Sequence, residues 1–163
     1  MTADEFKTLL ARVQTLEDAE SIRTLHQEFT RAVADRGFDI LAGFFTEDAV
    51  IDLRRHGEMS GREAIERHFA GMADAPLTGA GYVLSSPIVR VNGDVASGEW
   101  TWHRLLADAL VAGRPVRVWG VWEEGRYRCS YRRTEDGWRI SRMRFRVVLP
   151  EPDDSPAGRS DDE

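Results

Sequence analysis

Residues 22–69 constrain the fold of this chain more than any other segment. They read IRTLHQEFTRAVADRGFDILAGFFTEDAVIDLRRHGEMSGREAIERHF. Apolar residues recur at helical spacing up to Gly37, and Phe38–Phe45 then favours a short helix. A strand is expected at Ala49–Leu53, and a further helix opens at the Ser60–Glu63 capping box. The segment therefore predicts helix, strand and helix in quick succession.

Two helices are expected before Gly37. The second has an apolar stripe that ends near Val33, and Gly37 is expected to end it in the left-handed conformation that helix ends favour. The Thr15–Asp18 segment can cap a fresh start, which separates this helix from an earlier one. The apolar positions of the earlier helix are Phe6, Leu9, Leu10, Val13 and Leu16.

The second half of the chain changes from helical periodicity to strands. Asn92-Gly93 is a strong signal for a two-residue hairpin, and a bulge is expected near Glu124-Gly125. Helices first and an antiparallel meander last predict an α+β fold. The expected strands are Tyr82–Val91, Asp94–Ala107, Val116–Arg133 and Trp138–Leu149.

Length and charge narrow the classes of protein that remain. With 163 residues, one domain over residues 1–149 is expected, followed by an acidic, disordered tail at 150–163. A net charge of −6 argues against nucleic acid as a partner. No apolar run approaches the roughly eighteen residues of a membrane span. Cys129 is the only cysteine, so no internal disulfide forms and a cytoplasmic location is expected.

Two phrases in the second half carry a family resemblance. They are Ser86-Pro87-Ile88-Val89-Arg90-Val91-Asn92-Gly93-Asp94 and Gly125-Arg126-Tyr127-Arg128-Cys129 followed by Asp136-Gly137-Trp138. With the order of elements in 22–69, the chain resembles SnoaL-like domains of the nuclear transport factor 2-like superfamily over roughly residues 18–148. The resemblance implies a curved antiparallel sheet, wrapped by N-terminal helices into a cone with a central pocket. It also implies a homodimer packed through the sheet and no organic cofactor.

The resemblance points to proton-transfer chemistry, but three positions differ. Dehydratase-like relatives place a tyrosine or lysine and an aspartate on the second helix, and a histidine before the sheet. Here Phe29, Ala34 and Gly81-Tyr82 occupy those places. Asp35, one residue later, is the expected general base, with Tyr82 or His103 as its partner. The alternatives are a solvated Asp35, and a His103 that strand alternation places on the opposite face from Trp100 and Trp102.

Aromatic residues on the expected strands favour a flat ligand. We expect a small apolar, aromatic or polycyclic molecule to be bound in the pocket. The alternative for each ring is sheet core or a subunit interface. The predicted binding residues are Phe29, His26, Trp100, Trp102, Trp119 and Tyr127.

Arginines alternate along the last two strands and predict a positive stripe. They are Arg126, Arg128 and Arg132 on one strand and Arg142, Arg144 and Arg146 on the next. The stripe can hold a carboxylate or phosphate, or it is a solvated or interface face balanced by Glu99, Glu123 and Glu124. No pair of histidines has a metal-ligand spacing with a carboxylate, so no metal is expected. Cys129 is expected to be a buried, inert thiol.

These observations leave three functional hypotheses. The first is a cofactor-independent lyase, isomerase or cyclase that acts on an apolar or polycyclic substrate. The second is a non-catalytic ligand-binding or accessory subunit that retains the pocket. The third is an interaction module with a filled pocket and an exposed apolar patch.

Overall fold

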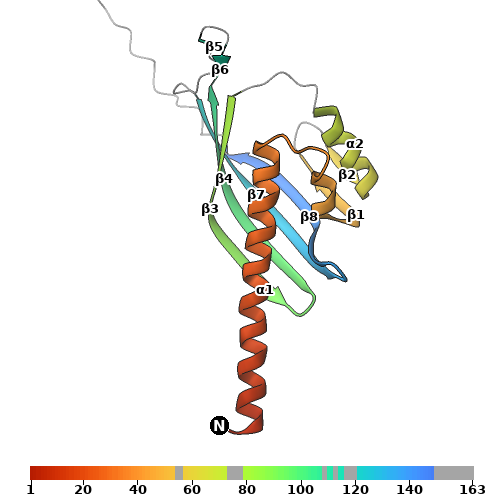
Figure 1. Cartoon of the computed structure of the whole chain (residues 1–163), viewed down its shortest axis with the longest axis vertical. Helices are drawn as coiled ribbons and strands as arrows, with labels where there is room; N and C mark the ends of the chain where they lie inside the picture. The colour runs from red at the N-terminus through yellow and green to blue at the C-terminus, as the bar shows by residue number, and fades with distance from the viewer. Residues whose placement is uncertain (54–56, 73–78, 108–109, 112–113, 116–120, 149–163) are drawn as a thin grey trace, which may run out of the picture.

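A computed structural model describes residues 1–53, 57–72, 79–107, 110–111, 114–115 and 121–148 (Figure 1). Helix α1 and helix α2 accompany a curved sheet, with a one-turn 3₁₀ helix, η1, before β1. A separate two-stranded ribbon joins β5 and β6. The elements are α1 (Ala3–Ala34), η1 (Leu41–Phe44), β1 (Phe45–Asp52), β2 (Glu58–Ser60), α2 (Arg62–Met72), β3 (Gly79–Asn92), β4 (Val95–Ala107), β5 (Leu110–Val111), β6 (Arg114–Pro115), β7 (Val121–Thr134) and β8 (Gly137–Val148).

The main sheet has the strand order β2-β1-β8-β7-β4-β3. Strands β3, β4, β7 and β8 form the expected antiparallel meander, and Gly93 makes the first turn with a φ of 59°. β1 pairs in parallel with β8, with Ile51 opposite Met143. The α+β prediction is confirmed, but the prediction of a wholly antiparallel sheet is wrong at this pair. The chain leaves β1 through β2 and α2, crosses to the far edge, and returns beside β1 in the same direction.

Helix α1 is one continuous helix of 32 residues, so the predicted break at Thr15–Asp18 is wrong. The Thr15 hydroxyl donates to the Ala11 carbonyl inside the helix, 2.9 Å away, instead of capping a new start. The true N-cap is Thr2, which forms a capping box with Glu5.

The helix ends at Ala34, but the left-handed residue is Arg36, with a φ of 59°, and not Gly37. The Gly37 amide still closes the end by donating to the Ala32 carbonyl at 2.9 Å. The prediction that Gly37 takes the left-handed conformation is therefore wrong by one residue.

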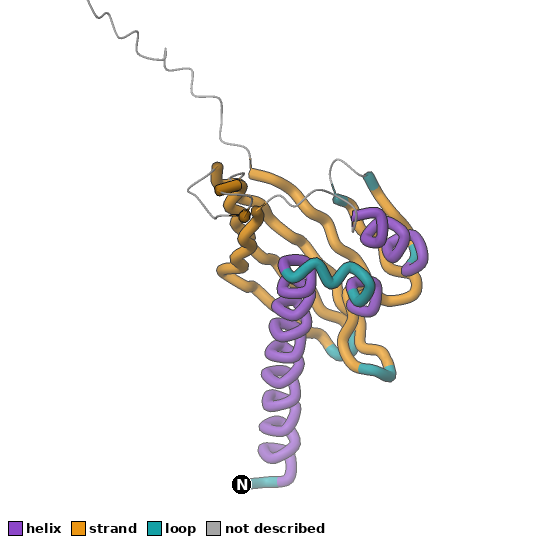
Figure 2. The backbone as a smooth tube through the Cα atoms, turned by 45° about the horizontal axis from the view of Figure 1, so that its top comes forward, coloured by secondary structure: helices purple, strands orange, loops and turns teal. Residues whose placement is uncertain are grey.

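The N-terminal half of α1 extends past the sheet (Figure 1). The apolar stripe expected there is exposed, at 42–70% for Phe6, Leu9, Leu10, Val13 and Leu16. Only from Asp18 onward does α1 bury residues. The turned view shows the same half of the helix standing clear of every strand (Figure 2).

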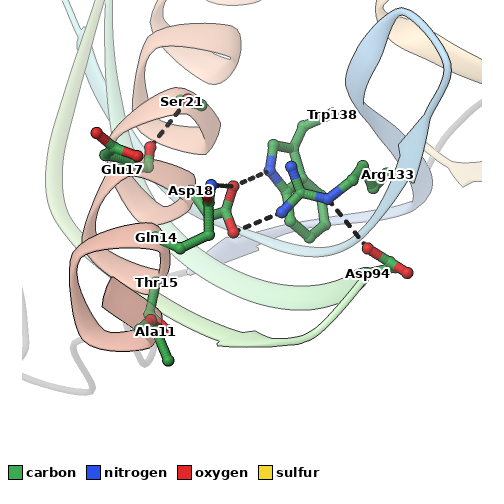
Figure 3. Close-up of polar contacts among 9 residues, drawn as sticks. All are labelled: Ala11, Gln14, Thr15, Glu17, Asp18, Ser21, Asp94, Arg133 and Trp138. Carbon is green, nitrogen blue, oxygen red and sulfur yellow. Dashed lines mark hydrogen bonds and ion pairs between the residues drawn. The ribbon is translucent and has the colours of Figure 1, made fainter. Parts of the chain in front are cut away.

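Asp18 fixes the helix where it reaches the sheet (Figure 3). Its carboxylate is 4% exposed and accepts hydrogen bonds from the Trp138 indole, at 3.1 Å, and from the Arg133 guanidinium, which pairs with it. Arg133 also lies 4.7 Å from the centre of the Trp138 ring and bonds exposed Asp94 at 3.0 Å. The β7–β8 hairpin is thereby joined to α1.

The core lies between α1 and the face of the sheet that α1 covers, called here the inner face. Ile22 and Phe29 from α1 meet Trp100, Tyr131 and other buried strand residues there. Phe69 of α2 closes the side of the core, with its ring centroid 6.4 Å from those of Phe29 and Phe45. No helix among the described residues is long and apolar enough to cross a membrane.

Gly125 does not form the bulge that its sequence predicts. β4 and β7 stay in register there, with Trp102 opposite Gly125, and the register of β7 shifts instead against β8, between Ser130 and Tyr131. A side chain at Gly125 would collide with the Trp102 ring and come within 2.6 Å of the Arg146 carbonyl oxygen. The glycine is explained by close approach, the other reason for glycine in a strand.

Candidate functional site

His26 is the centre of the candidate site. It lies on the buried side of α1 and is fully enclosed, with 0% of its surface exposed. Its imidazole stacks on the Trp100 indole, with ring centroids 4.3 Å apart and planes 4° from parallel. Tyr127 and Phe29 present rings to it at 5.5 and 5.9 Å. A polar ring is thus surrounded by aromatic ones.

A chain of hydrogen bonds reaches one nitrogen of this imidazole. The Trp100 Nε1–H donates to the Tyr131 hydroxyl oxygen at 2.8 Å, and that hydroxyl lies 3.2 Å from His26 Nδ1. Tyr131 is 1% exposed. Its burial is the main cause that raises the pKa of the phenol well above the ordinary value, and the nearby Cys129 adds to this effect. The phenol therefore keeps its proton.

The other nitrogen, His26 Nε2, has no hydrogen-bond partner among the residues that the structure describes. Buried polar groups are nearly always bonded, so this nitrogen needs an explanation. Burial lowers the pKa of His26 to about 3, since a charged imidazole would lose its hydration. The ring is neutral at physiological pH.

Gly98 makes this arrangement possible. A side chain there would bring a carbon within 2.9 Å of Tyr131 Cε2 and within 3.0 Å of both Trp100 Nε1 and the Tyr131 hydroxyl. The first distance is shorter than real contacts of a Cβ atom, and the other two are tighter than nine in ten of them. Sequence reasoning missed both Gly98 and Tyr131. The only available signal was that Gly98, Trp100 and Tyr131 alternate onto one face.

Beyond His26, rings continue along the inner face and form an aromatic wall, defined here as Trp100, Trp102, Tyr127 and Phe145. Trp102 stacks on Phe145 with centroids 4.8 Å apart, and Phe145 lies 5.3 Å from Tyr127. Trp102 is 2% exposed, whereas Tyr127 and Phe145 are half-buried. The wall places a largely buried group of apolar rings, tilted against one another by 28–48°, next to one polar ring.

The structure brings together five of the six predicted binding residues. Phe29, His26, Trp100, Trp102 and Tyr127 all lie in this inner group. Trp119 lies outside the described residues. Phe29 is 4% exposed and packs on Phe44, Phe45 and Phe69, so its contacts are those of a core residue.

The predicted catalytic residues are not brought together. Asp35 caps the C-terminal end of α1 and is exposed, away from the buried imidazole. His103 occupies the opposite face from Trp100 and Trp102, as strand alternation predicts, and its Nε2 lies 3.4 Å from the Ser85 hydroxyl. The Tyr82 side chain lies outside the described residues. Asp35 and His103 thus share no site with each other.

Cys129 is buried, as its position predicts. Burial raises its pKa to about 12, which outweighs the opposing effect of its hydrogen bond with Tyr131. The thiol therefore stays protonated and is a poor nucleophile. Within the described part of the chain, no three metal-ligating side chains lie close enough together to hold a metal ion.

The arginine stripe exists on the outer face, the side of the sheet away from α1. Arg126 lies opposite Arg146, and Arg128 lies opposite Arg144. Acidic side chains accompany them: Asp52 pairs with Arg144 and Arg146, Glu58 with Arg142, Glu99 with Arg128 and Asp48 with Arg132. These ion pairs fit the interpretation of a charge-balanced face.

Two open grooves also occur on the surface. One, of about 500 Å³, runs between α1 and the start of β8 and is lined by Glu17, Glu20 and Glu28. The other, of about 450 Å³, is lined by Arg90, Arg132 and serines of three strands. His26 lines neither of these two grooves.

Comparison with known protein structures identifies the class of fold. The fold is that of the nuclear transport factor 2-like proteins. A member with a cystatin-like fold from Novosphingobium aromaticivorans superposes with a TM-score of 0.70 at 22% identity, over 93% of this chain and 95% of that one. A candidate dehydratase of this class from Streptomyces avermitilis gives a TM-score of 0.66 at 22% identity, over 82% and 98% of the two chains.

Sequence comparison gives a narrower assignment than the fold does, because it identifies the protein family. The model of the SnoaL-like domain matches residues 14–144, and the chain belongs to this family. An uncharacterised protein of Mycobacterium tuberculosis is 31% identical over 132 residues, which are 80% of this chain and 85% of that protein. The expected family is confirmed.

Proposed function

We propose that this protein binds a flat, apolar or polycyclic small molecule against the aromatic wall, and that His26 makes the polar contact with it. The observation that carries the proposal is the fully buried imidazole whose Nε2 has no partner among the described residues. A buried polar atom left without a hydrogen bond costs about 1–3 kcal/mol. A ligand that bonds Nε2 would recover this free energy.

The surroundings of His26 support an aromatic or polycyclic ligand. Stacked and edge-on rings prefer other flat apolar surfaces, and ligand pockets combine such surfaces with a few polar groups. The ring is enclosed, so entry of a ligand requires side chains of the wall to move. The half-buried Tyr127 and Phe145 are the members of the wall with the most freedom to do so.

Proton-transfer catalysis is the second candidate function. It is favoured by the fold shared with a candidate dehydratase and by a neutral histidine inside the domain. In this version His26 takes the role that the sequence assigned to Asp35, in a cofactor-independent lyase, isomerase or cyclase. No carboxylate among the described residues contacts the ring, and this favours binding without catalysis.

The proposal also includes a homodimer formed through the outer face, and a cytoplasmic location. Exposed apolar side chains on β3 and β4 support the dimer: Val83, Ile88 and Val95 are 54%, 47% and 53% exposed. Sedimentation of the full chain is expected to give twice the mass of one chain. Ile88→Glu is expected to shift it toward the monomer, and a wild-type monomer at micromolar concentration would contradict the dimer.

His26→Leu is expected to weaken binding while the fold is kept, because leucine fills most of the space but cannot hydrogen-bond. A thermal-shift screen against steroids and aromatic polyketides first finds a ligand. Binding to the native state at a hundredfold excess over Kd stabilises it by about 2.7 kcal/mol. Titration calorimetry should then give an affinity about fivefold lower for His26→Leu.

Asp35→Asn is the matched control, since this carboxylate is exposed and apart from the ring. It is expected to bind like the wild type. Loss of binding in Asp35→Asn with retention in His26→Leu would reject the site proposed here and restore the sequence-based assignment.

A further inference from the structure

The direction of one hydrogen bond is fixed by chemistry. An indole Nε1–H can only donate, so the Tyr131 oxygen accepts from Trp100 at 2.8 Å. The tyrosine then has a single proton of its own to give. Two atoms can receive it: His26 Nδ1, at 3.2 Å, and the sulfur of Cys129.

The imidazole nitrogen is the better acceptor of the two. A thiol sulfur accepts weakly, whereas a bare imidazole nitrogen accepts well. Cys129 stays a thiol because burial raises its pKa to about 12. Its S–H can therefore donate a hydrogen bond to the second lone pair of the Tyr131 oxygen. In this arrangement each of the three groups around Tyr131 is satisfied.

We propose that the Trp100–Tyr131 pair holds His26 as the neutral tautomer with its proton on Nε2, so that the ligand must present an uncharged hydrogen-bond acceptor, such as a carbonyl oxygen, to that nitrogen. This inference rests on the proposed function and names the chemical class of its ligand. Nδ1 is occupied by the Tyr131 proton, and Nε2–H is the group left for a ligand.

The surroundings favour an uncharged acceptor. A carboxylate or phosphate would lose its hydration in this enclosed aromatic site, and no cation among the described residues contacts the His26 ring to offset that loss. An ammonium group would bring a second donor against Nε2–H. A ketone or quinone oxygen on a polycyclic frame is both uncharged and a hydrogen-bond acceptor.

The tautomer can be measured without any ligand. In ¹⁵N NMR spectra of the full chain, a protonated ring nitrogen and a bare one differ widely in chemical shift. The His26 signals are assigned by their absence from His26→Gln. The wild type is expected to show a protonated Nε2 and a bare, hydrogen-bonded Nδ1.

Two variants test the source of the hydrogen bond. Tyr131→Phe removes the hydroxyl and is expected to shift the Nδ1 signal toward that of an unbonded nitrogen. Cys129→Ala is the matched control and should leave the His26 signals unchanged. A wild type protonated on Nδ1, or a Cys129→Ala spectrum that moves as much as that of Tyr131→Phe, would overturn the assignment.

A pair of probes tests the ligand class. 9-Fluorenone and fluorene share a flat tricyclic frame and differ in one carbonyl group. The wild type is expected to bind fluorenone about fivefold more tightly than fluorene, as one net hydrogen bond predicts, and His26→Leu should remove the difference. Equal binding of both probes by the wild type would reject the carbonyl inference and leave aromatic binding intact. If neither binds, the proposed function fails for this frame, and the NMR result still decides the tautomer.

Discussion

Asp18→Ala is expected to lower the free energy of unfolding by about 3 kcal/mol, because it leaves the Arg133 cation and the Trp138 indole without their shared acceptor. The Asp18 carboxylate is nearly fully buried, and its partners Arg133 and Trp138 come from the β7–β8 hairpin, far along the chain. Urea unfolding followed by circular dichroism measures the change. This variant loses both the ion pair with Arg133 and the hydrogen bond with Trp138 that join α1 to the β7–β8 hairpin.

Asp94→Ala is the matched control for Asp18→Ala. Asp94 bonds the same Arg133 at 3.0 Å, but its side chain is 82% exposed. Exposed ion pairs contribute about 0–1 kcal/mol, so the control should change stability little. Equal losses in the two variants would show that burial of Asp18 does not decide its contribution.

The same carboxylate makes stability depend on pH. Burial alone would raise the pKa of Asp18, but hydrogen bonds from Arg133, Trp138 and Gln14 hold it below the ordinary value of 3.8. A lowered native pKa contributes stability that is complete above 3.8 and is lost as pH falls through the native value. The difference in stability between wild type and Asp18→Ala should therefore shrink in acid. A difference that stays constant down to pH values well below 3.8 would contradict this account.

Gly125→Ala is expected to be the other severe substitution, with a loss of roughly 3 kcal/mol from forced overpacking. The new methyl group would collide with the Trp102 indole, and it would lie within 2.6 Å of the Arg146 carbonyl, which the backbone holds in place. Trp102 would have to leave Phe145, so near-ultraviolet circular dichroism should change along with the unfolding midpoint.

Gly43→Ala provides the comparison for Gly125→Ala. No atom lies within 4 Å of the position that its methyl group would take, and its φ is not positive. It should leave both stability and the aromatic signals near those of the wild type. A tolerated Gly125→Ala would show that β7 and Trp102 are less tightly packed than the structure indicates.

Much of the fold could be predicted because its signals are local. Period-two alternation and Asn92-Gly93 gave the meander, and its strand limits that fall on described residues came within a few residues of those observed. The expected start of one strand at Val116 and the expected end of the last at Leu149 lie outside the described residues. The parallel pairing of β1 with β8 could not be predicted in this way, since it depends on how distant elements pack. The break expected at Thr15 failed because a capping sequence acts only where the helix has a reason to stop.

For the candidate site, the sequence could predict which strand residues share a face of the sheet, but not which side chains form hydrogen bonds. Alternation put Trp100 and Trp102 on one face of their strand and His103 on the other, as observed. The approach of Tyr131 to His26 joins residues more than a hundred positions apart, and no spacing rule reports such a contact. Asp35 was chosen for its distance along α1 from the positions used by relatives, but the helix ends before it can turn inward.

The place of β8 also sets the order in which this chain can mature during synthesis. β8 is made after every other strand of this sheet, yet it lies in the middle of the sheet, between β1 and β7. Until it emerges, β1 and α2 have no sheet to join, and Asp18 lacks Trp138. Until β8 emerges, the nascent chain therefore carries an open strand edge and exposed apolar side chains, which are features that promote aggregation.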